Sequence, residues 1–508
     1  MSFEGGRLRA SDRARGGELS LEADVVIVGA GAGGCAAAAA LAESGLSVVV
    51  LEEGRHWEPA DFQPRTTFAL KHLYQARGAR TLRGNAVIPM PGGRGVGGST
   101  LINSAICFRC PPEVLKTWRD THGCDTLTDE RFEGYFDRIW KTLGVMVNPV
   151  EVQRNNNLIF KAGAEKLGLK GSFLARSAPG CQGCGICQYG CPSGGKFSAD
   201  RTFLAEALGS GRVAAWSDCR IRTAKTRGDR VVEVVGDVLD PESQAVVGSV
   251  RARADTFVLA GGPIQSPLFL LANGFADHTH CGEHLVVHPT VGSLARFPWS
   301  IEFWKGVTQG YYVDCWDRGF LLQTYTTTPD QTYLTLHTRL GRETMEVMSD
   351  LASMASAGTL VHDEDSHGAV RHTPVGADLS SWLGEGDKRK IIDGMRLCAE
   401  VFFAAGATEV FPGRIGIDRV RSPDEIEAAL PYDLDPGVLM LYASHPMGTC
   451  RMGADAATSV VDPVGRVWGT ANLRVADASI FPTSLGVNPQ VTTMAMGLHV
   501  GHDIAAGA

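Results

Sequence analysis

The chain is 508 residues long, carries a formal charge of −8, and is 44% hydrophobic with 7% aromatic residues. This length exceeds what one hydrophobic core supports, so we expect two or more domains. The acidic balance argues against a nucleic-acid partner, and no apolar run is long enough to span a bilayer.

Residues 1–22 are charged and glycine-rich, and they contain no apolar stretch of the kind found in a secretory signal. We predict a flexible arm there. The chain has 13 cysteines. Without a secretory signal, they favour a reducing compartment, and the expected location is cytoplasmic.

Residues 23–54, ADVVIVGAGAGGCAAAAALAESGLSVVVLEEG, have the order of a nucleotide-binding unit. VVIV is typical of a strand buried on both faces of a parallel sheet. Gly29-x-Gly31-x-x-Gly34 then opens an alanine-rich helix, and a second strand ends at Glu52. The glycines allow a tight turn and close approach of backbone to a pyrophosphate, and the carboxylate can accept from ribose hydroxyls. The pattern predicts a dinucleotide site without separating FAD from NAD.

A second glycine-rich loop, PMPGGRGVGGSTLINSAICFR (89–109), lets backbone lie against something flat and charged. Residues 112–170 then have a helical pattern.

The run Cys181-x2-Cys184-x2-Cys187-x3-Cys191 has the spacing of a bacterial ferredoxin. Such thiols can hold an iron–sulfur cluster or a zinc ion, pair as disulfides, or remain free, and the sequence leaves these alternatives open.

From Arg212 the pattern changes to the alternation of antiparallel strands. Residues 257–274 return to strand, glycine turn and helix, and residues 290–345 alternate again with many aromatic side chains. Nucleotide-type strands near both ends, with a separate sheet between them, predict an α/β fold. It would consist of a discontinuous Rossmann-like cofactor domain with an inserted substrate domain built on an antiparallel sheet backed by helices.

The expected division follows from these patterns. It comprises the arm at 1–22, a cofactor-binding domain at 23–111, 198–289 and 438–508, a helical and cysteine-rich connection at 112–197, and a substrate domain at 290–437.

Two polar residues stand out near the C-terminal end. His445 lies in SHPMGTCRMG (444–453), and Asn488 lies in GVNPQVTTMAM (486–496). A histidine near neutral pKa can take a hydroxyl proton, and an asparagine can hold the same oxygen by a hydrogen bond. Alcohol oxidation needs both roles beside a hydride acceptor. We therefore predict His445 and Asn488 as the catalytic residues.

Four blocks of the chain, in order, resemble the glucose–methanol–choline (GMC) oxidoreductases, which are FAD enzymes acting on alcohols. The blocks are VVIVGAGAGG with Glu52, GGRGVGGSTLINSAI, FVLAGGPIQSPLFLL, and the C-terminal block with His445 and Asn488. Weaker agreement occurs at CGEHLVVHP (281–289). The pairing of His with Asn is most similar to the long-chain alcohol oxidase and sterol oxidase branches.

The resemblance implies non-covalent FAD, because Ile102 stands where some members attach FAD through a histidine. It implies a cofactor site made of Gly29, Gly31, Gly34, Glu52, Gly97, Ser99, Asn103, Cys219, Asp477, Ala478 and Asn488. It further implies an oxidoreductase for the CH–OH group of a small, apolar alcohol. His445 would accept the hydroxyl proton as hydride passes to flavin N5, and Asn488 would position the oxygen. The electron acceptor is left open among O₂, a quinone and a cytochrome.

Two other functions stay open. Some membrane-linked sugar dehydrogenases of the family carry an iron–sulfur cluster, although with different cysteine spacing. A flavoprotein dehydrogenase assisted by such a cluster, passing electrons to a quinone or cytochrome, is therefore one alternative. A non-redox, flavin-containing lyase is the other.

Overall fold

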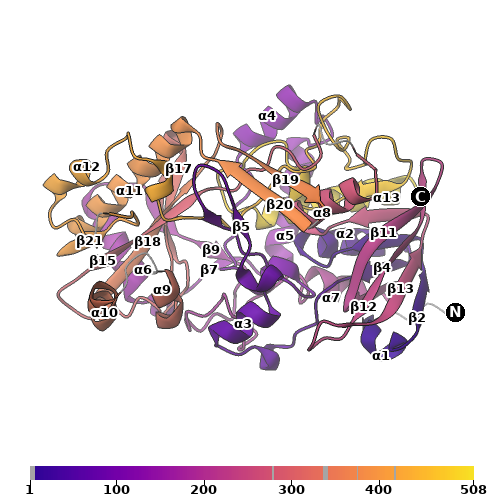
Figure 1. Ribbon diagram of the computed structural model, residues 1–508, viewed down its shortest axis with the longest axis horizontal. Helices are drawn as coiled ribbons and strands as arrows, with labels where there is room; N and C mark the ends of the chain where they lie inside the picture. The colour runs from indigo at the N-terminus through magenta and orange to yellow at the C-terminus, as the bar shows by residue number, and fades with distance from the viewer. Residues whose placement is uncertain (1–5, 277–279, 336–340, 375, 417–418) are drawn as a thin grey trace.

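The computed structural model describes residues 6–276, 280–335, 341–374, 376–416 and 419–508. Two large sheets organise this part of the chain: a parallel sheet on the right of Figure 1 and an antiparallel sheet on the left. The α/β fold predicted from the sequence is confirmed.

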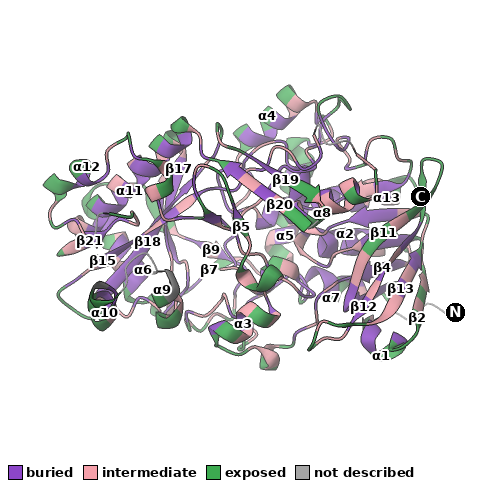
Figure 2. Ribbon diagram, in the orientation of Figure 1, coloured by how far each residue is buried: buried purple, intermediate pink, exposed green. Residues whose placement is uncertain are grey.

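The parallel sheet has six strands in the order β1-β10-β4-β3-β14-β23. Their bounds are Gly6–Arg9 (β1), Val213–Ser217 (β10), Val48–Leu51 (β4), Val25–Val28 (β3), Thr256–Leu259 (β14) and Leu473–Val475 (β23). Helix α2 (Ala32–Glu43) follows β3, and the C-terminal helix α13 (Gln490–Ala506) packs on it. The two helices approach closely because α13 has a glycine at the contact: a Cβ on Gly497 would lie 2.3 Å from the carbonyl oxygen of Gly33. Figure 2 shows α2 as buried.

The antiparallel sheet has the order β21-β15-β18-β17-β16-β8, with β22 paired to β15. The bounds are Glu409–Phe411 (β21), Thr290–Arg296 (β15), Met354–Val361 (β18), Phe320–Thr324 (β17), Tyr311–Cys315 (β16), Gly171–Phe173 (β8) and Leu441–Tyr442 (β22). Helices α11 (Glu385–Ala405) and α6 (Val150–Lys166) pack against it. Their apolar side chains and those of the sheet form one buried cluster.

A four-stranded sheet, β11-β12-β13-β2, lies beside the parallel sheet (Figure 1). It contains Cys219–Arg227 (β11), Arg230–Leu239 (β12), Val246–Arg253 (β13) and Glu18–Glu22 (β2). Residues 6–22 therefore differ from the flexible arm that we expected. β1 pairs with β10 and β2 pairs with β13, so backbone hydrogen bonds to distant segments order them. Residues 1–5 of that expected arm lie outside the described residues.

Shorter elements complete the fold. The helices are Ala10–Ala14 (α1), Thr66–His72 (α3), Pro112–His122 (α4), Asp129–Thr142 (α5), Phe203–Gly209 (α7), Gly262–Ala272 (α8), Pro329–Thr335 (α9), Arg342–Ser349 (α10) and Ile426–Ala429 (α12). The strands are Thr81–Leu82 (β5), Ile88–Pro89 (β6), Met146–Val147 (β7), Ala175–Arg176 (β9), His367–Thr373 (β19) and Gly376–Trp382 (β20). Within the described ranges, none of the helices has the length and apolarity needed to cross a bilayer.

Candidate functional site

A cavity of about 1530 Å³ is lined by residues of both large sheets. At one end it reaches Val28, Leu51 and Leu259, the last residues of three parallel strands. At the other end it reaches Leu294, Gln323 and Leu360 on the antiparallel sheet. Ligand crevices of open α/β sheets lie outside the carboxyl ends of the strands. The volume exceeds the ~300–1,000 Å³ of a typical small-molecule pocket, so it suits a large cofactor together with a substrate.

The three glycines of the first loop have different surroundings. Gly29 has φ +110°, and a Cβ there would lie 2.3 Å from the carbonyl oxygen of Ala260. A Cβ on Gly34 would lie 2.1 Å from the carbonyl oxygen of Gly29. A Cβ on Gly31 would meet no protein atom closer than 4.0 Å, and Gly31 lines the cavity. The protein itself therefore requires glycine at positions 29 and 34, whereas position 31 keeps backbone open to the cavity at the start of α2.

Glu52 directly follows β4 at the same edge of the parallel sheet. Its Oε2 accepts from the N–H of Ala30 (3.0 Å), and its Oε1 accepts from those of Gly54 (2.9 Å) and Gly95 (3.3 Å). Burial raises the pKa of Glu52 to about 7 despite these donors. Each carboxylate oxygen can accept more than one hydrogen bond, so a ribose hydroxyl still finds an acceptor here. The donor and acceptor set of this edge fits the ADP part of FAD.

Most of the predicted cofactor residues line the cavity. Besides Gly29, Gly31 and Glu52, these are Ser99, Asn103, Cys219, Asp477, Ala478 and Asn488. Gly34 and Gly97 do not line it. Gly97 has φ +112°, and a Cβ there would lie 2.8 Å from Oδ1 of Asp200, so this glycine serves the turn itself.

Asp477 ties the C-terminal segment to the start of α8. Its Oδ2 accepts from the N–H of Gly262 (2.9 Å) and from the hydroxyl of Ser266 (2.6 Å). Its Oδ1 accepts from the N–H of Ser479 (2.8 Å). This predicted cofactor residue is thus already held by three donors, and it brings the turn at Ala478 to the cavity wall.

The structure brings His445 and Asn488 together on the cavity wall. Nε2 of His445 lies 3.3 Å from Nδ2 of Asn488, and Oδ1 of Asn488 accepts from Nε2 of Gln323 at 2.9 Å. Gln323 comes from β17, so the antiparallel sheet supports a pair that the C-terminal segment supplies. Burial lowers the pKa of His445 to about 4, which keeps its imidazole neutral near pH 7. A neutral imidazole beside a carboxamide can exchange a proton with, and orient, a hydroxyl group.

His288 also contacts the site, and the sequence alone indicated no role for it. Its Nδ1 lies 3.2 Å from Nδ1 of His445, and its Nε2 accepts from the N–H of Gly486 at 2.8 Å. The imidazole is fully buried. The only sequence signal for it was its place in CGEHLVVHP, a block that matched the family without indicating a task.

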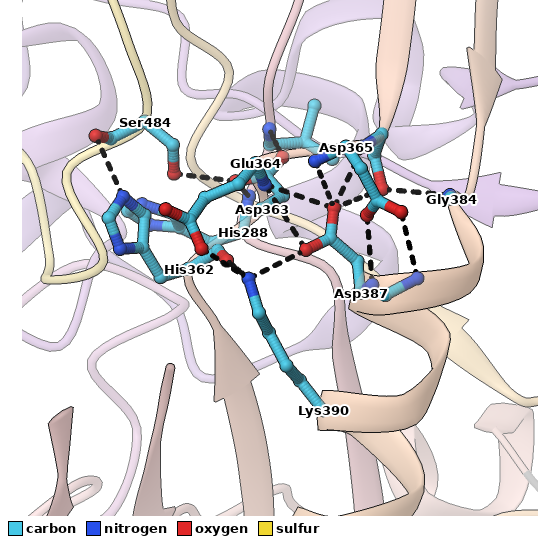
Figure 3. Close-up of polar contacts among 12 residues, drawn as sticks. His288, His362, Asp363, Glu364, Asp365, Gly384, Asp387, Lys390 and Ser484 are labelled. Atoms are coloured by element: carbon cyan, nitrogen blue, oxygen red, sulfur yellow. Dashed lines mark hydrogen bonds and ion pairs between the residues drawn. The ribbon is translucent and has the colours of Figure 1, made fainter. Parts of the chain in front are cut away.

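Asp363 holds the segments that carry this second histidine (Figure 3). Its carboxylate accepts from the N–H groups of Val287 (2.7 Å) and His288 (3.2 Å) and from the hydroxyl of Ser484 (2.6 Å). His362 contacts the carbonyl oxygen of Ser484 through Nε2 at 3.2 Å. One buried carboxylate therefore joins the segment before β15 to the turn that leads to Asn488.

The cysteine run does not form a metal-binding arrangement. The guanidinium of buried Arg176 donates to Sγ of Cys181 (3.4 Å) and to Sγ of Cys187 (3.3 Å). Sγ of Cys191 accepts from the backbone N–H of Lys196 at 3.3 Å, and Cys184 is exposed. In the part of the chain that the structure describes, no three His, Cys, Asp or Glu side chains are placed to hold a metal ion. The iron–sulfur or zinc site considered for these cysteines is therefore not supported, because the Arg176 guanidinium already binds two of the thiols.

Comparison with known proteins adds sequence and fold evidence. Residues 23–290 match the model of the N-terminal part of the GMC oxidoreductase family, and residues 364–497 match that of its C-terminal part. An uncharacterized GMC-type oxidoreductase of Mycobacterium tuberculosis is 33% identical over 491 residues, covering 95% of this chain and 76% of the relative. A long-chain-alcohol oxidase of Arabidopsis thaliana is 27% identical, covering 96% of this chain and 67% of the relative.

Two solved structures share the fold at low sequence identity. Pyridoxine 4-oxidase from Mesorbium loti has a TM-score of 0.71 at 18% identity, covering 94% of this chain and 98% of its own. A variant of formate oxidase from Aspergillus oryzae has a TM-score of 0.74 at 15% identity, covering 96% of this chain and 99% of its own. At these identities the likeness concerns the fold.

Proposed function

Because the chain belongs to the GMC oxidoreductase family, we propose that it is an FAD-dependent oxidoreductase that oxidises the CH–OH group of an alcohol. The observation that carries this proposal is the pairing of His445 with Asn488 on the wall of the cavity that begins at Gly31 and Glu52. When bound, the flavin supplies an acceptor for a hydride. The residues of this chain would bind the cofactor, orient the alcohol and handle its proton.

Cofactor binding is proposed for the edge of the parallel sheet. Gly31 lets the cofactor approach the start of α2, where backbone N–H groups and the helix dipole favour a pyrophosphate. Glu52 accepts from the ribose. Ile102, at the position where some family members bear a histidine, lines the cavity and offers no nucleophile, which supports non-covalent FAD.

His445 is proposed as the base that takes the hydroxyl proton, and Asn488 as the group that holds the oxygen. A positioned general base contributes roughly 10²–10⁴-fold to a rate. Gln323 keeps the carboxamide in place through its 2.9 Å hydrogen bond. Placing the reacting carbon correctly supplies a further large part of the acceleration.

An apolar alcohol is the proposed substrate class. Beyond the His–Asn pair, the cavity wall contains apolar side chains from several elements: Leu70, Leu294, Val347, Leu360, Phe411 and Met440. They offer apolar contacts to an aliphatic substrate. The likeness to a long-chain-alcohol oxidase supports the same class.

Anaerobic mixing of the FAD-loaded protein with a panel of alcohols tests this function. We expect bleaching of the flavin absorbance by aliphatic alcohols, with faster reduction as the chain lengthens, and at least a hundredfold loss in His445→Ala. No bleaching by any alcohol would contradict the proposal and favour a non-redox use of the flavin. Adding O₂, a quinone or a cytochrome to the reduced protein then identifies the electron acceptor.

A further inference from the structure

A backbone N–H determines where the proton of His288 lies. Gly486 donates to Nε2 of His288 at 2.8 Å. A neutral imidazole has one N–H and one lone pair, so a ring that accepts at Nε2 carries its proton on Nδ1. Burial, followed by the neighbouring His445 and His362, lowers the pKa of His288 well below its ordinary range, so the ring is neutral.

The contact with His288 likewise determines where the proton of His445 lies. Nδ1 of His288 lies 3.2 Å from Nδ1 of His445, with the ring planes at 78°. Since His288 carries its proton on this nitrogen, it donates and His445 accepts. A neutral His445 that accepts at Nδ1 must carry its own proton on Nε2.

Asn488 has to adapt to that arrangement. Its Nδ2 lies 3.3 Å from Nε2 of His445, and two N–H groups cannot bond to each other. The oxygen and nitrogen of an amide exchange places by a half-turn, which the backbone N–H of Gly486 cannot do. If Asn488 and Gln323 both turn, their 2.9 Å hydrogen bond is kept with its direction reversed. Gln309, whose Nε2 donates to Oε1 of Gln323 at 3.4 Å, has to turn with them. The donors then run in one direction, from Gly486 through the two histidines and Asn488 to Gln323.

We propose that His288 is a positioning residue that holds the proton of resting His445 on Nε2. In the resting site this N–H donates to Oδ1 of the turned Asn488, and Nε2 of His445 has no free lone pair for a hydroxyl proton. The form of His445 that can take a hydroxyl proton arises when the hydrogen bond between Gly486 and His288 opens. This last, kinetic part rests on the proposed function, whereas the proton positions do not.

The surrounding contacts keep the Gly486 donor in place. Asp363 binds both the N–H of His288 and the hydroxyl of Ser484 (Figure 3). Gly486 has φ +69°, and a Cβ there would lie 2.3 Å from the ring of Trp316. The turn is therefore packed as well as hydrogen-bonded. Besides His445, the titratable groups that face His288 are His362 and Asp363, and behind Asp363 lie Glu364, Asp387 and Lys390 (Figure 3).

The form of His445 that can act as a base has its lone pair on Nε2, and it needs both histidines to carry their protons on the opposite ring nitrogens. His445 would donate from Nδ1, His288 would accept at Nδ1 and carry its proton on Nε2, and that N–H would face the N–H of Gly486. Leaving a buried donor without an acceptor disfavours this form by about tenfold to a hundredfold. His288 thus limits the fraction of His445 that is ready to act as a base.

Histidine-labelled holoprotein, with ¹⁵N and ¹³C shifts measured by NMR, reports the tautomers directly. Signals are assigned by their loss in His288→Asn and His445→Gln. Near pH 7 we expect Nδ1–H for His288 and Nε2–H for His445. Either Nδ1–H or a charged ring at His445 would overturn the proposal, whatever the outcome of any activity assay.

The variant His288→Asn tests what holds the tautomer. Its amide can either donate to or accept from His445, so both tautomers of His445 should become populated. His362→Asn is the matched control, because His362 contacts Ser484 but not His445, and the tautomer should stay unchanged there. A His445 that remains purely Nε2–H in His288→Asn would refute the role of His288.

Flavin reduction completes the test. At saturating alcohol, His288→Asn should reduce its flavin up to about tenfold faster than the unmodified protein, because the constraint on the base is removed. A slower rate together with released tautomers would refute the kinetic part. Absence of any reduction by alcohols in the unmodified protein, with the expected tautomers present, would refute the proposed function and leave the positioning role standing.

Discussion

Replacing Gly31 with alanine should separate cofactor binding from folding. Gly31 has φ −81°, ψ −166°, which alanine adopts without strain, and its Cβ would meet no protein atom closer than 4.0 Å. Alanine is a weaker N-cap than glycine, but this costs less than about 1 kcal/mol. We therefore expect the apoprotein of Gly31→Ala to melt within a few degrees of the parent.

The added methyl group should weaken the binding of the cofactor. It would project into the cavity at the start of α2, where we propose that the backbone approaches the pyrophosphate. Overpacking by a methyl group costs about 1–3 kcal/mol, and each 1.4 kcal/mol is tenfold in a dissociation constant. The affinity for FAD should therefore fall by about 5- to 150-fold.

The assay is titration of apoprotein with FAD, followed by quenching of flavin fluorescence, alongside a circular-dichroism melt. Gly34→Ala is the matched control, because its Cβ would lie 2.1 Å from the carbonyl oxygen of Gly29 and 3.0 Å from Cβ of Ala260. This control should lower the melting temperature of the apoprotein itself. If Gly31→Ala bound FAD within twofold of the parent, the cavity at the start of α2 would not hold the pyrophosphate.

Three further predictions concern the polar groups of the site and the cysteine run. The rate of flavin reduction should be nearly flat from pH 8 to about pH 5 and fall only through about pH 4, because protonation removes the base and burial lowers the pKa of His445 to about 4. A midpoint near 6.5 in stopped-flow traces would contradict this. Glu52→Ala should release FAD during dilution while leaving the reduction rate of the FAD-bound fraction unchanged, which gel filtration and stopped-flow would show together. Burial raises the pKa of Cys187, but Arg176 and Lys196 outweigh it and leave the pKa below its usual value. Alkylation of that thiol, followed by mass spectrometry, should therefore start at lower pH than in Arg176→Gln, and equal profiles would remove the guanidinium as the cause.

The parts of the site that could be predicted from the sequence are those that depend on residues close together in the chain. A β-branched run, a glycine-spaced turn and an acid at the end of the next strand depend on residues within one supersecondary unit. The structure places Gly29, Gly31 and Glu52 at one cavity edge accordingly. His445 and Asn488 were found because each lies in a distinctive block, and their 3.3 Å approach then depends on the fold.

Long-range contacts explain what the sequence could not reveal. His288 is 157 positions from His445 in the chain. Its proposed role depends on the backbone N–H of Gly486, and a backbone group cannot be recognised from the type of residue that carries it. The spacing of the cysteine run suggested convergence on a metal. Arg176, which no cysteine motif contains, instead reaches two of the thiols. The N-terminal residues looked like an arm because their pairing partners lie some 200 positions away.

The pairing of His445 with Asn488 thus depends on a part of the chain outside both of their motifs. Asp363 follows the end of β18 and binds the backbone of Val287 and His288 on one side and Ser484 on the other. Because two segments share one buried carboxylate, neither can shift without breaking hydrogen bonds to the other. Gly358 and Leu360 of β18 also line the cavity. A substitution there that reshapes the cavity can therefore alter the proton order that we propose for His445 without touching it.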